Sequence, residues 1–184
     1  MRRLAAGVMV LGALVATPSI ACADGFIAPF VGINFGGDTT KNSTPFGGSL
    51  GFLGHTAGVE LDFGYTPNFF GNTATIHVDD GKVATVMGNV LIGGRHHGAS
   101  PYVALGAGLI RTNIDAVQDA FDIHETENNW GGNIGGGVFI GSGPVTFRGD
   151  FRYFKSFDTS GDFPEITGEK LGFWRATVGV GFMW

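Results

Sequence analysis

The sequence predicts an all-β fold, an eight-stranded antiparallel up-and-down transmembrane β-barrel that spans residues 24–184 of the 184-residue chain. Three observations lead to this prediction. Apolar residues recur at every second position in eight segments of roughly ten residues, which is typical of membrane-barrel strands. The breaks between these segments alternate between short and long. After residue 23 there is no apolar run of helix length, which leaves a soluble β-structure or a membrane barrel.

The N-terminus has the pattern of an export signal. Arg2 and Arg3 precede an apolar run over residues 4–16, and Ala21 and Ala23 fit the small-x-small rule for signal peptidase. We therefore expect residues 1–23 to be a signal peptide that is cleaved after Ala23. A membrane anchor is the alternative, but this run is shorter than the roughly 20 residues that a helix needs to cross a bilayer.

The single cysteine, Cys22, lies in the expected cleavage region, so the mature chain is expected to have no thiol and no disulfide. The stretch "SIAC" also resembles part of a lipobox, which makes lipidation of Cys22 the alternative to ordinary cleavage. Ser19 argues against lipidation, because it stands where a lipobox has a large aliphatic residue.

The mature chain is acidic. Of the 11 Lys and Arg residues, Arg2 and Arg3 leave with the expected signal, so nine remain against 16 Asp and Glu, a formal charge of −7. A negative surface of this kind repels nucleic acid, which we exclude as a partner.

The eight expected strands are bounded by polar, Gly-marked or Pro-marked breaks. They cover residues 26–37, 46–54, 58–66, 82–94, 101–113, 130–141, 145–157 and 172–184. An even number of strands lets an up-and-down sheet close with both ends of the barrel chain on one side.

The connections between the expected strands differ in length. "HTA", "RHHGAS" and "SGP" are short, whereas the breaks that begin at Asp38, Pro67, Ile114 and Asp158 are longer and contain most of the acidic residues. Short turns at one end and long loops at the other are typical of outer-membrane barrels. The third long loop, "DAVQDAFDIHE", spaces its apolar residues like a short helix, so we expect one within residues 115–125.

The last segment shows the strand pattern most clearly. One face carries Trp174, Ala176, Val178, Val180, Phe182 and Trp184. Ten steps of about 3.3 Å, tilted by about 40°, rise roughly 25 Å, which is the height of the apolar band on such barrels. The two tryptophans then lie at the two membrane interfaces. A soluble sandwich strand is the alternative, but it would expose these Trp and Phe side chains to water.

Other aromatic residues are expected to join these two interfaces. We assign Tyr65, Trp130 and Tyr153 to the outer girdle with Trp174, and Tyr102 to the inner girdle with Trp184.

Charged residues alternate with apolar ones in three of the expected strands. Within "GVELDFGY" and "VTFRGDFRYF" all the charges lie on one face of the strand. In the last segment Arg175 lies on the face opposite the apolar series that begins at Trp174. A lipid-facing Arg near the middle of the bilayer costs about 2 to 4 kcal/mol, so these side chains should face the lumen. The expected lumen polar network is Glu60, Asp62, Arg148, Asp150, Arg152 and Arg175. A polar interior that only fills space is the simpler interpretation, and we favour it over a catalytic one.

Three stretches, "GVELDFGYTPNFF", "PYVALGAGL" and "FRGDFRYF", resemble the porin-like, OmpA-type and opacity-type outer-membrane β-barrel domain family of Gram-negative-type bacteria. The resemblance covers nearly all of residues 26–184. It implies insertion into the bacterial outer membrane, with outer-membrane lipid, lipopolysaccharide and the outer-membrane assembly machinery as partners. It also implies an assembly signal at the end of the chain, carried by Val180, Phe182 and Trp184. We expect no cell-wall-binding domain of the full-length OmpA type after Trp184.

Three functions are compatible with such a barrel. The first is a structural or surface-interaction role with a largely plugged lumen, because an eight-stranded barrel is just wide enough inside for side chains to fill. The alternative is a narrow porin-like channel for ions or small solutes, which glycine-rich strands such as "NIGGGVFIG" would leave room for.

A lipid-modifying enzyme is the disfavoured third function. The five histidines are His55, His77, His96, His97 and His124, and none has a serine two residues on, as the deacylase motif requires. We expect no catalytic residue, no cofactor and no specific metal site, since the calcium-loop spacing D-x-D-x-D-G is absent. The acidic loops are expected to share divalent ions diffusely with lipopolysaccharide phosphates, and their protein partner is not identified by the sequence.

Overall fold

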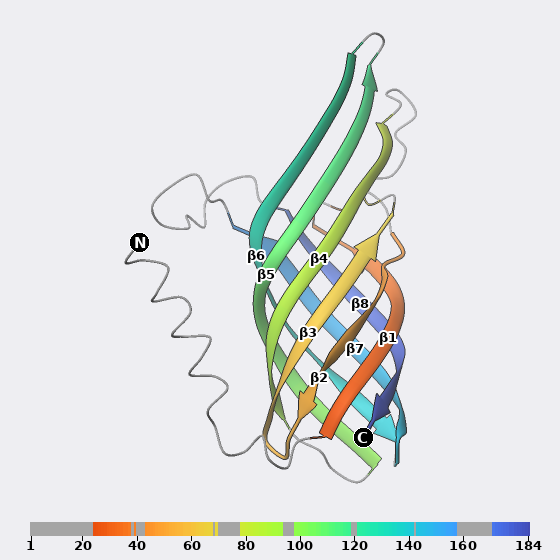
Figure 1. Ribbon diagram of the computed structural model, residues 1–184, viewed down its shortest axis with the longest axis vertical. Helices are drawn as coiled ribbons and strands as arrows, with labels where there is room; N and C mark the ends of the chain where they lie inside the picture. The colour runs from red at the N-terminus through yellow and green to blue at the C-terminus, as the bar shows by residue number, and fades with distance from the viewer. Residues whose placement is uncertain are drawn as a thin grey trace, which may run out of the picture.

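The computed structural model is a closed barrel in which eight antiparallel strands pair in sequence order and β1 pairs with β8 (Figure 1). The strands are β1 (Asp24–Phe35), β2 (Phe46–Leu53), β3 (Ala57–Thr66), β4 (Val78–Gly93), β5 (Gly98–Gln118), β6 (Phe121–Gly141), β7 (Val145–Ser156) and β8 (Gly172–Met183). The structure describes residues 24–37, 39, 43–67, 69, 78–93, 98–118, 121–141, 143–157 and 171–184, with the backbone alone for 78–80, 113–118 and 121–128. Across these ranges no helix is long and apolar enough to cross a membrane.

All eight predicted strands are present, and the largest difference concerns β5 and β6. They extend to Gln118 and from Phe121, through the region where the sequence suggested a loop with a short helix. The helix prediction was wrong, because the ladder continues until Gln118 pairs with Phe121. An isolated helix of three turns is marginal, whereas each added pair of a hairpin extends a ladder that already exists.

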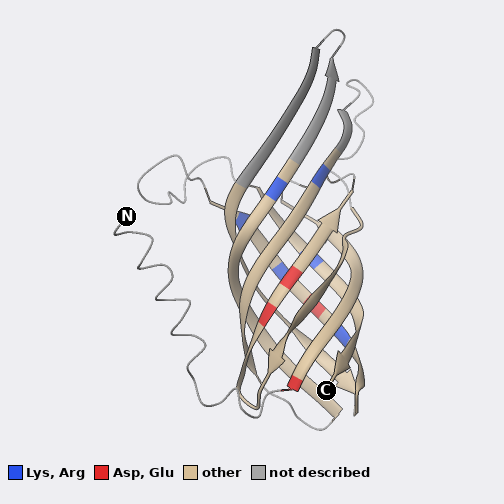
Figure 2. Cartoon of the chain, in the orientation of Figure 1, with Lys and Arg blue, Asp and Glu red and all other residues tan. Residues whose placement is uncertain are grey.

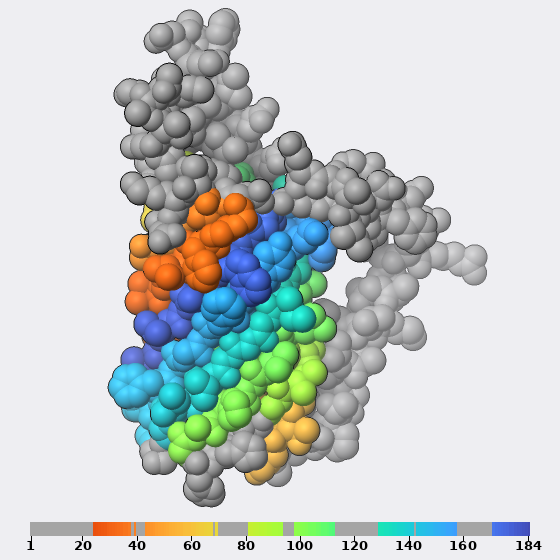
Figure 3. Space-filling view, turned by 180° about the vertical axis from the view of Figure 1, so that it is seen from behind, coloured from red at the N-terminus to blue at the C-terminus, as the bar shows by residue number. Residues whose placement is uncertain are grey.

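The alternation of side chains divides each strand between an outer and an inner face, as predicted. On β8, Trp174, Val178 and Phe182 are exposed while Arg175 and Met183 are buried. The outer wall is apolar over the whole circumference. Its exposed large side chains include Ile27, Val31, Phe46, Leu50, Phe52, Leu61, Phe63, Val90, Val103, Leu105, Ile134, Phe147, Phe151 and Trp174. Figure 3 shows the rear of this wall, where β1, β8, β7 and β6 lie side by side.

The outer aromatic girdle contains the residues assigned to it, and the inner one does not. Tyr65, Trp130 and Trp174 are exposed on the outside, and Tyr153 packs against Trp174 with ring centroids 4.9 Å apart. The prediction for Tyr102 was wrong, because its side chain is only 4% exposed and lies in the lumen. Its neighbour Val103 is 54% exposed, so alternation alone requires Tyr102 to point inward.

The two ends of the barrel differ as the loop lengths predicted. The strand ends that the short connections join, β2 to β3, β4 to β5 and β6 to β7, lie at the same end of the barrel as the C-terminus (Figure 1). There Gly25 and Trp184 exchange two backbone hydrogen bonds of 3.1 and 3.0 Å, which close the sheet.

Two apolar clusters fill the lumen at different heights. The inner cluster consists of Phe26, Ala28, Leu53, Leu91, Tyr102, Ala104, Phe139 and Met183. The outer cluster consists of Phe69, Val83, Met87, Ile110, Phe154 and Phe173, with Leu171 packed against it. The order along β4 is Met87 in the outer cluster, then buried Asn89, then Leu91 in the inner cluster. Polar side chains therefore occupy a layer between two apolar layers.

Candidate functional site

The polar layer contains all six charged residues that the sequence assigned to the lumen. Glu60 and Asp62 come from β3, Arg148, Asp150 and Arg152 from β7, and Arg175 from β8, and each is at most 7% exposed. Figure 2 shows acidic and basic positions on different strands at the middle height of the barrel. The contacts of Glu60 and Asp62 with the arginines run across the lumen, because β3 is not a sheet neighbour of β7 or β8.

Arg148 makes more lumen contacts than any other charged side chain described. Its Nη2 lies 2.5 Å from Oε2 of Glu60 and 3.2 Å from Oδ2 of Asp150, and its Nη1 donates to Oγ of Ser49. Its Nε donates to the Tyr102 hydroxyl at 2.7 Å. The guanidinium also lies over the Phe139 ring, 4.9 Å from the centroid, so the inner apolar cluster directly covers this charge.

Arg152 is completely buried and connects two carboxylates. Its Nε and Nη2 donate to Oδ1 and Oδ2 of Asp150 at 2.7 and 2.8 Å, a two-pronged geometry that suits a guanidinium. The same Nη2 lies 2.8 Å from Oε1 of Glu60. Glu60 is therefore shared between Arg148 and Arg152, so removing its carboxylate breaks an ion pair of each arginine.

Arg175 forms the second, separate ion pair of the layer. Its Nη2 lies 2.5 Å from Oδ1 of Asp62, and Nη1 donates to Oγ1 of Thr85 at 3.3 Å. The guanidinium is held between aromatic rings, 4.3 Å from the centroid of Phe154 and 5.1 Å from that of Phe30. Because Phe154 belongs to the outer cluster, this end of the charged layer is also covered by apolar side chains.

Neutral residues complete the network, and sequence reasoning missed them. The Tyr102 hydroxyl donates to Oδ2 of Asp150 at 2.5 Å, and Asn89 Nδ2 donates to Oε1 of Glu60 at 2.9 Å. Asn133 Nδ2 in turn donates to Oδ1 of Asn89 at 2.8 Å. The alternation of the sequence could have assigned them to the lumen, since each of these residues stands at an inward position of a strand whose outward positions are apolar.

A glycine on the lumen face of β6 makes room for Tyr102. A Cβ at Gly137 would collide with the Tyr102 hydroxyl and with the carbonyl oxygen of Gly149. The missing Cβ therefore leaves room for the tyrosine ring beside its pairing partner, and its hydroxyl reaches Asp150. The glycine-rich stretch of β6 thus makes space that a large polar side chain then occupies.

The layer is balanced in charge, with three carboxylates and three guanidinium groups. Removing ions from water costs several kcal/mol each, and only close pairing with further hydrogen bonds compensates for it. The compensation is nearly complete here. The buried side-chain atoms of these groups and their polar neighbours that have no hydrogen bond within the described chain are Arg152 Nη1, Arg175 Nε and Asn133 Oδ1.

Possible metal ligands do not gather in groups in the described part of the chain. Within it, no three His, Cys, Asp or Glu side chains are grouped so that they could hold a metal ion. His55 is exposed in the turn between β2 and β3. His77, His96 and His97 lie outside the described residues, and only the backbone of His124 is described.

The remaining predicted site residues have other locations. Val180, Phe182 and Trp184 all point outward from β8, and Trp184 is the most exposed large apolar side chain described, at 72%. Their role as an assembly signal stays a prediction. Ala21 and Ala23 of the expected cleavage site lie outside the described residues.

Comparisons with known proteins agree with this architecture. The family model described as the outer membrane protein β-barrel domain matches residues 6–184. Neisserial surface protein A has a similar solved structure, with a TM-score of 0.64 at 13% identity over 88% of this chain and 97% of that chain. No curated protein matches the sequence significantly.

Two barrels of Pseudomonas aeruginosa are also similar in structure. The N-terminal β-barrel domain of OprF has a TM-score of 0.53 at 21% identity, over 89% of this chain and 98% of that one. Outer membrane protein H (OprH) has a TM-score of 0.54 at 12% identity, over 88% and 100%. At these identities the likeness concerns the fold alone, whereas the family model spans nearly the whole chain. The chain therefore belongs to the outer membrane protein β-barrel domain family and is a protein of the bacterial outer membrane.

Proposed function

We propose that this protein is a structural or surface-interaction barrel whose lumen is largely plugged, without enzymatic activity. The observation that carries the proposal is the charged layer, in which Arg152 is 0% exposed and Glu60 3% exposed between two apolar clusters. An ion that entered the lumen would have to displace apolar side chains at both ends and separate ion pairs between them. The function would then lie on the outside of the barrel, in its loops and its lipid-facing wall.

The proposed partners follow from the same surface. Outer-membrane lipid covers the apolar wall, and lipopolysaccharide lies at the outer rim, where Lys82, Arg111 and Lys155 occupy outward positions of β4, β5 and β7. Basic side chains at this height favour contact with anionic headgroups. The assembly machinery of the outer membrane would bind the end of β8, and the acidic loops would bind a partner outside the cell.

A narrow channel for ions or small solutes is the second candidate. It is favoured by the polar atoms Arg152 Nη1 and Asn133 Oδ1, which are buried in the middle layer without a hydrogen bond to the described chain. Groups of this kind attract water, and a hydrated layer would conduct if the apolar clusters moved aside.

The test is conductance together with stability. We predict that the wild type, refolded into a planar bilayer, conducts little. Arg152→Ala and Glu60→Ala should each raise the conductance and lower the unfolding temperature on gels, because a buried charge without its partner costs about 3 to 5 kcal/mol and draws in water. The double variant should cost less than the sum of the two, since Arg148 and Asp150 can still pair at 3.2 Å.

Leu61→Ala is the matched control. It shortens a lipid-facing side chain, 43% exposed, that directly follows Glu60 on β3, so it should leave the conductance unchanged. A wild type that conducts like a general porin, with no response to either charge removal, would contradict the plugged barrel and support the channel.

A further inference from the structure

The seam between β1 and β8 has one position where the ladder cannot be complete. Gly25 and Trp184 exchange both of their backbone hydrogen bonds, so the same pattern recurs at every second residue, through Ile27 opposite Phe182 to Pro29 opposite Val180. Proline has no N–H, so Pro29 cannot donate to the Val180 carbonyl. The paired residues of β1 on this side accordingly pass from Ile27 directly to Phe30.

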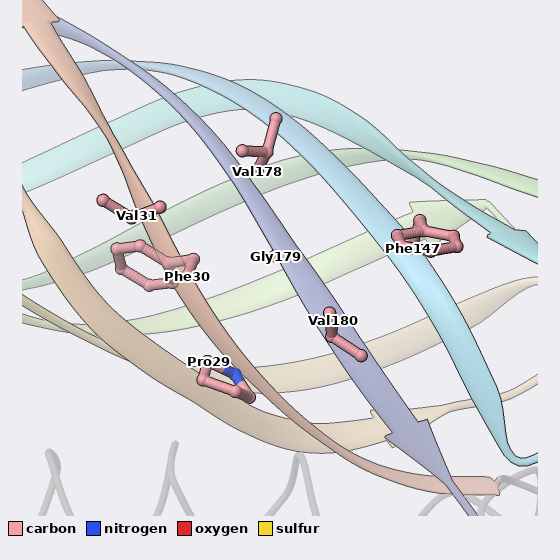
Figure 4. A pocket seen from close by; sticks show the side chains of 7 residues that line it. All are labelled: Pro29, Phe30, Val31, Phe147, Val178, Gly179 and Val180. Carbon is pink, nitrogen blue, oxygen red and sulfur yellow. The ribbon is translucent and has the colours of Figure 1, made fainter.

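An apolar groove lies on the outer wall at this point. It has a volume of about 510 Å³ and is lined by Pro29, Phe30, Val31, Phe147, Val178, Gly179 and Val180 (Figure 4). Phe147 and Val178 stand out from the wall, 69% and 65% exposed. Phe30 and Gly179 belong to the inward-facing series of their strands, so no outward side chain of these two residues covers the backbone at the floor of the groove.

The depth of the groove lies within the hydrocarbon region of the membrane. Val178 is four residues from Trp174 at the outer girdle and six from Trp184, so it is roughly 10 Å from one interface and 15 Å from the other. Phe147 is two residues from the start of β7 at the inner end. The groove thus runs from near the inner interface to about the middle of the bilayer.

We propose that this groove holds one acyl chain of a phospholipid from the inner leaflet. The described lining carries no charged side chain, and a single hydrocarbon chain is narrow and flexible enough to reach its floor. An empty groove would leave lining atoms without dispersion partners. A second copy of the barrel fits less well, because two convex walls meet along their highest points. Such a contact would touch Phe147 and Val178 and leave the floor at Gly179 unfilled.

The experiment uses the refolded barrel in phosphatidylcholine vesicles that contain a trace of phosphatidylcholine with a diazirine in one acyl chain. After photolysis, labelled peptides are quantified by mass spectrometry. We expect about fivefold more label on the groove residues of β1, β7 and β8 than on the lipid-facing wall of β3 to β5. Val180→Phe should remove this excess by filling the groove, whereas Val86→Phe, an outward valine of β4 with 40% exposure, should retain it.

Folding is checked by heat modifiability on unboiled gels, and Val31→Phe fills the groove from β1 if Val180→Phe does not fold. Uniform label around the barrel would overturn the proposal and leave ordinary lipid contact only. Val178→Cys tests the second copy, since the mature chain is expected to have no other cysteine. Rapid disulfide-linked dimers together with an unlabelled groove would overturn the proposal in favour of a dimer interface.

Discussion

At the scale of single residues, the lumen combines small and large side chains in complementary positions. Arg148 reaches Ser49, Glu60 and Tyr102, which come from three different strands. Glycines on the inner faces leave space for the other two arginines, because a Cβ at Gly64 would collide with Nη1 of Arg175 and one at Gly135 with Cγ of Arg152. The stability of the charged layer therefore depends on residues that carry no charge.

Gly137→Ala tests this dependence. The added Cβ collides with the Tyr102 hydroxyl and the Gly149 carbonyl, so we expect a loss of about 1 to 3 kcal/mol, as for other overpacked cores, measured as a lower unfolding temperature on gels. Gly149→Ala is the control, because nothing described lies within 4 Å of its Cβ position. Equal effects of the two changes would mean that glycine matters here only for the flexibility of the backbone.

At the scale of the strands, β8 has two different faces and two different tasks. Its inner face brings Arg175 to Asp62, and its outer face ends on Trp184. The backbone of Trp184 also closes the barrel through its hydrogen bonds with Gly25. A role of the side chain in assembly must therefore be separated from the role of the backbone.

Trp184→Asp makes that separation, because it keeps the backbone hydrogen bonds and removes the terminal aromatic ring. We expect a several-fold lower yield of heat-modifiable barrel in cells, with little change in the stability of the fraction that folds. Trp184→Phe should retain the yield. An unchanged yield with Asp would argue that the assembly machinery does not read this residue.

Much of the fold and part of the site could be predicted from the sequence. Alternation assigns each residue to a face, and this was sufficient to place Glu60 and Arg148 in the lumen. It cannot show that they meet, because 88 residues separate them and the contact depends on how the strands are staggered around the closed barrel. Tyr102 was misassigned because aromatic residues near a strand end were taken as girdle residues, although Val103 and Leu105 already define the outer face of β5.

At the scale of the whole molecule, export and removal of the expected signal peptide come before the barrel can insert into the outer membrane. The paired alanines Ala21 and Ala23 predict that the mature protein begins at Asp24, the first residue of β1. N-terminal sequencing of membrane-derived protein should therefore read Asp-Gly-Phe-Ile. A blocked N-terminus with an acylated Cys22 would instead establish lipidation.

The distribution of the six lumen charges along the chain has a consequence for folding. Among the buried charges of the described residues, Glu60 and Asp62 on β3 sum to −2, while those of β7 and β8 sum to +2. A partly built sheet that lacks its last two strands would carry two uncompensated carboxylates on its concave side. The ion pairs that cross the lumen form only when β7 and β8 join, so the free energy that they contribute is released at that step. We therefore expect barrel closure to be coupled to neutralisation, with the carboxylates of an incomplete barrel favouring water until β7 and β8 join.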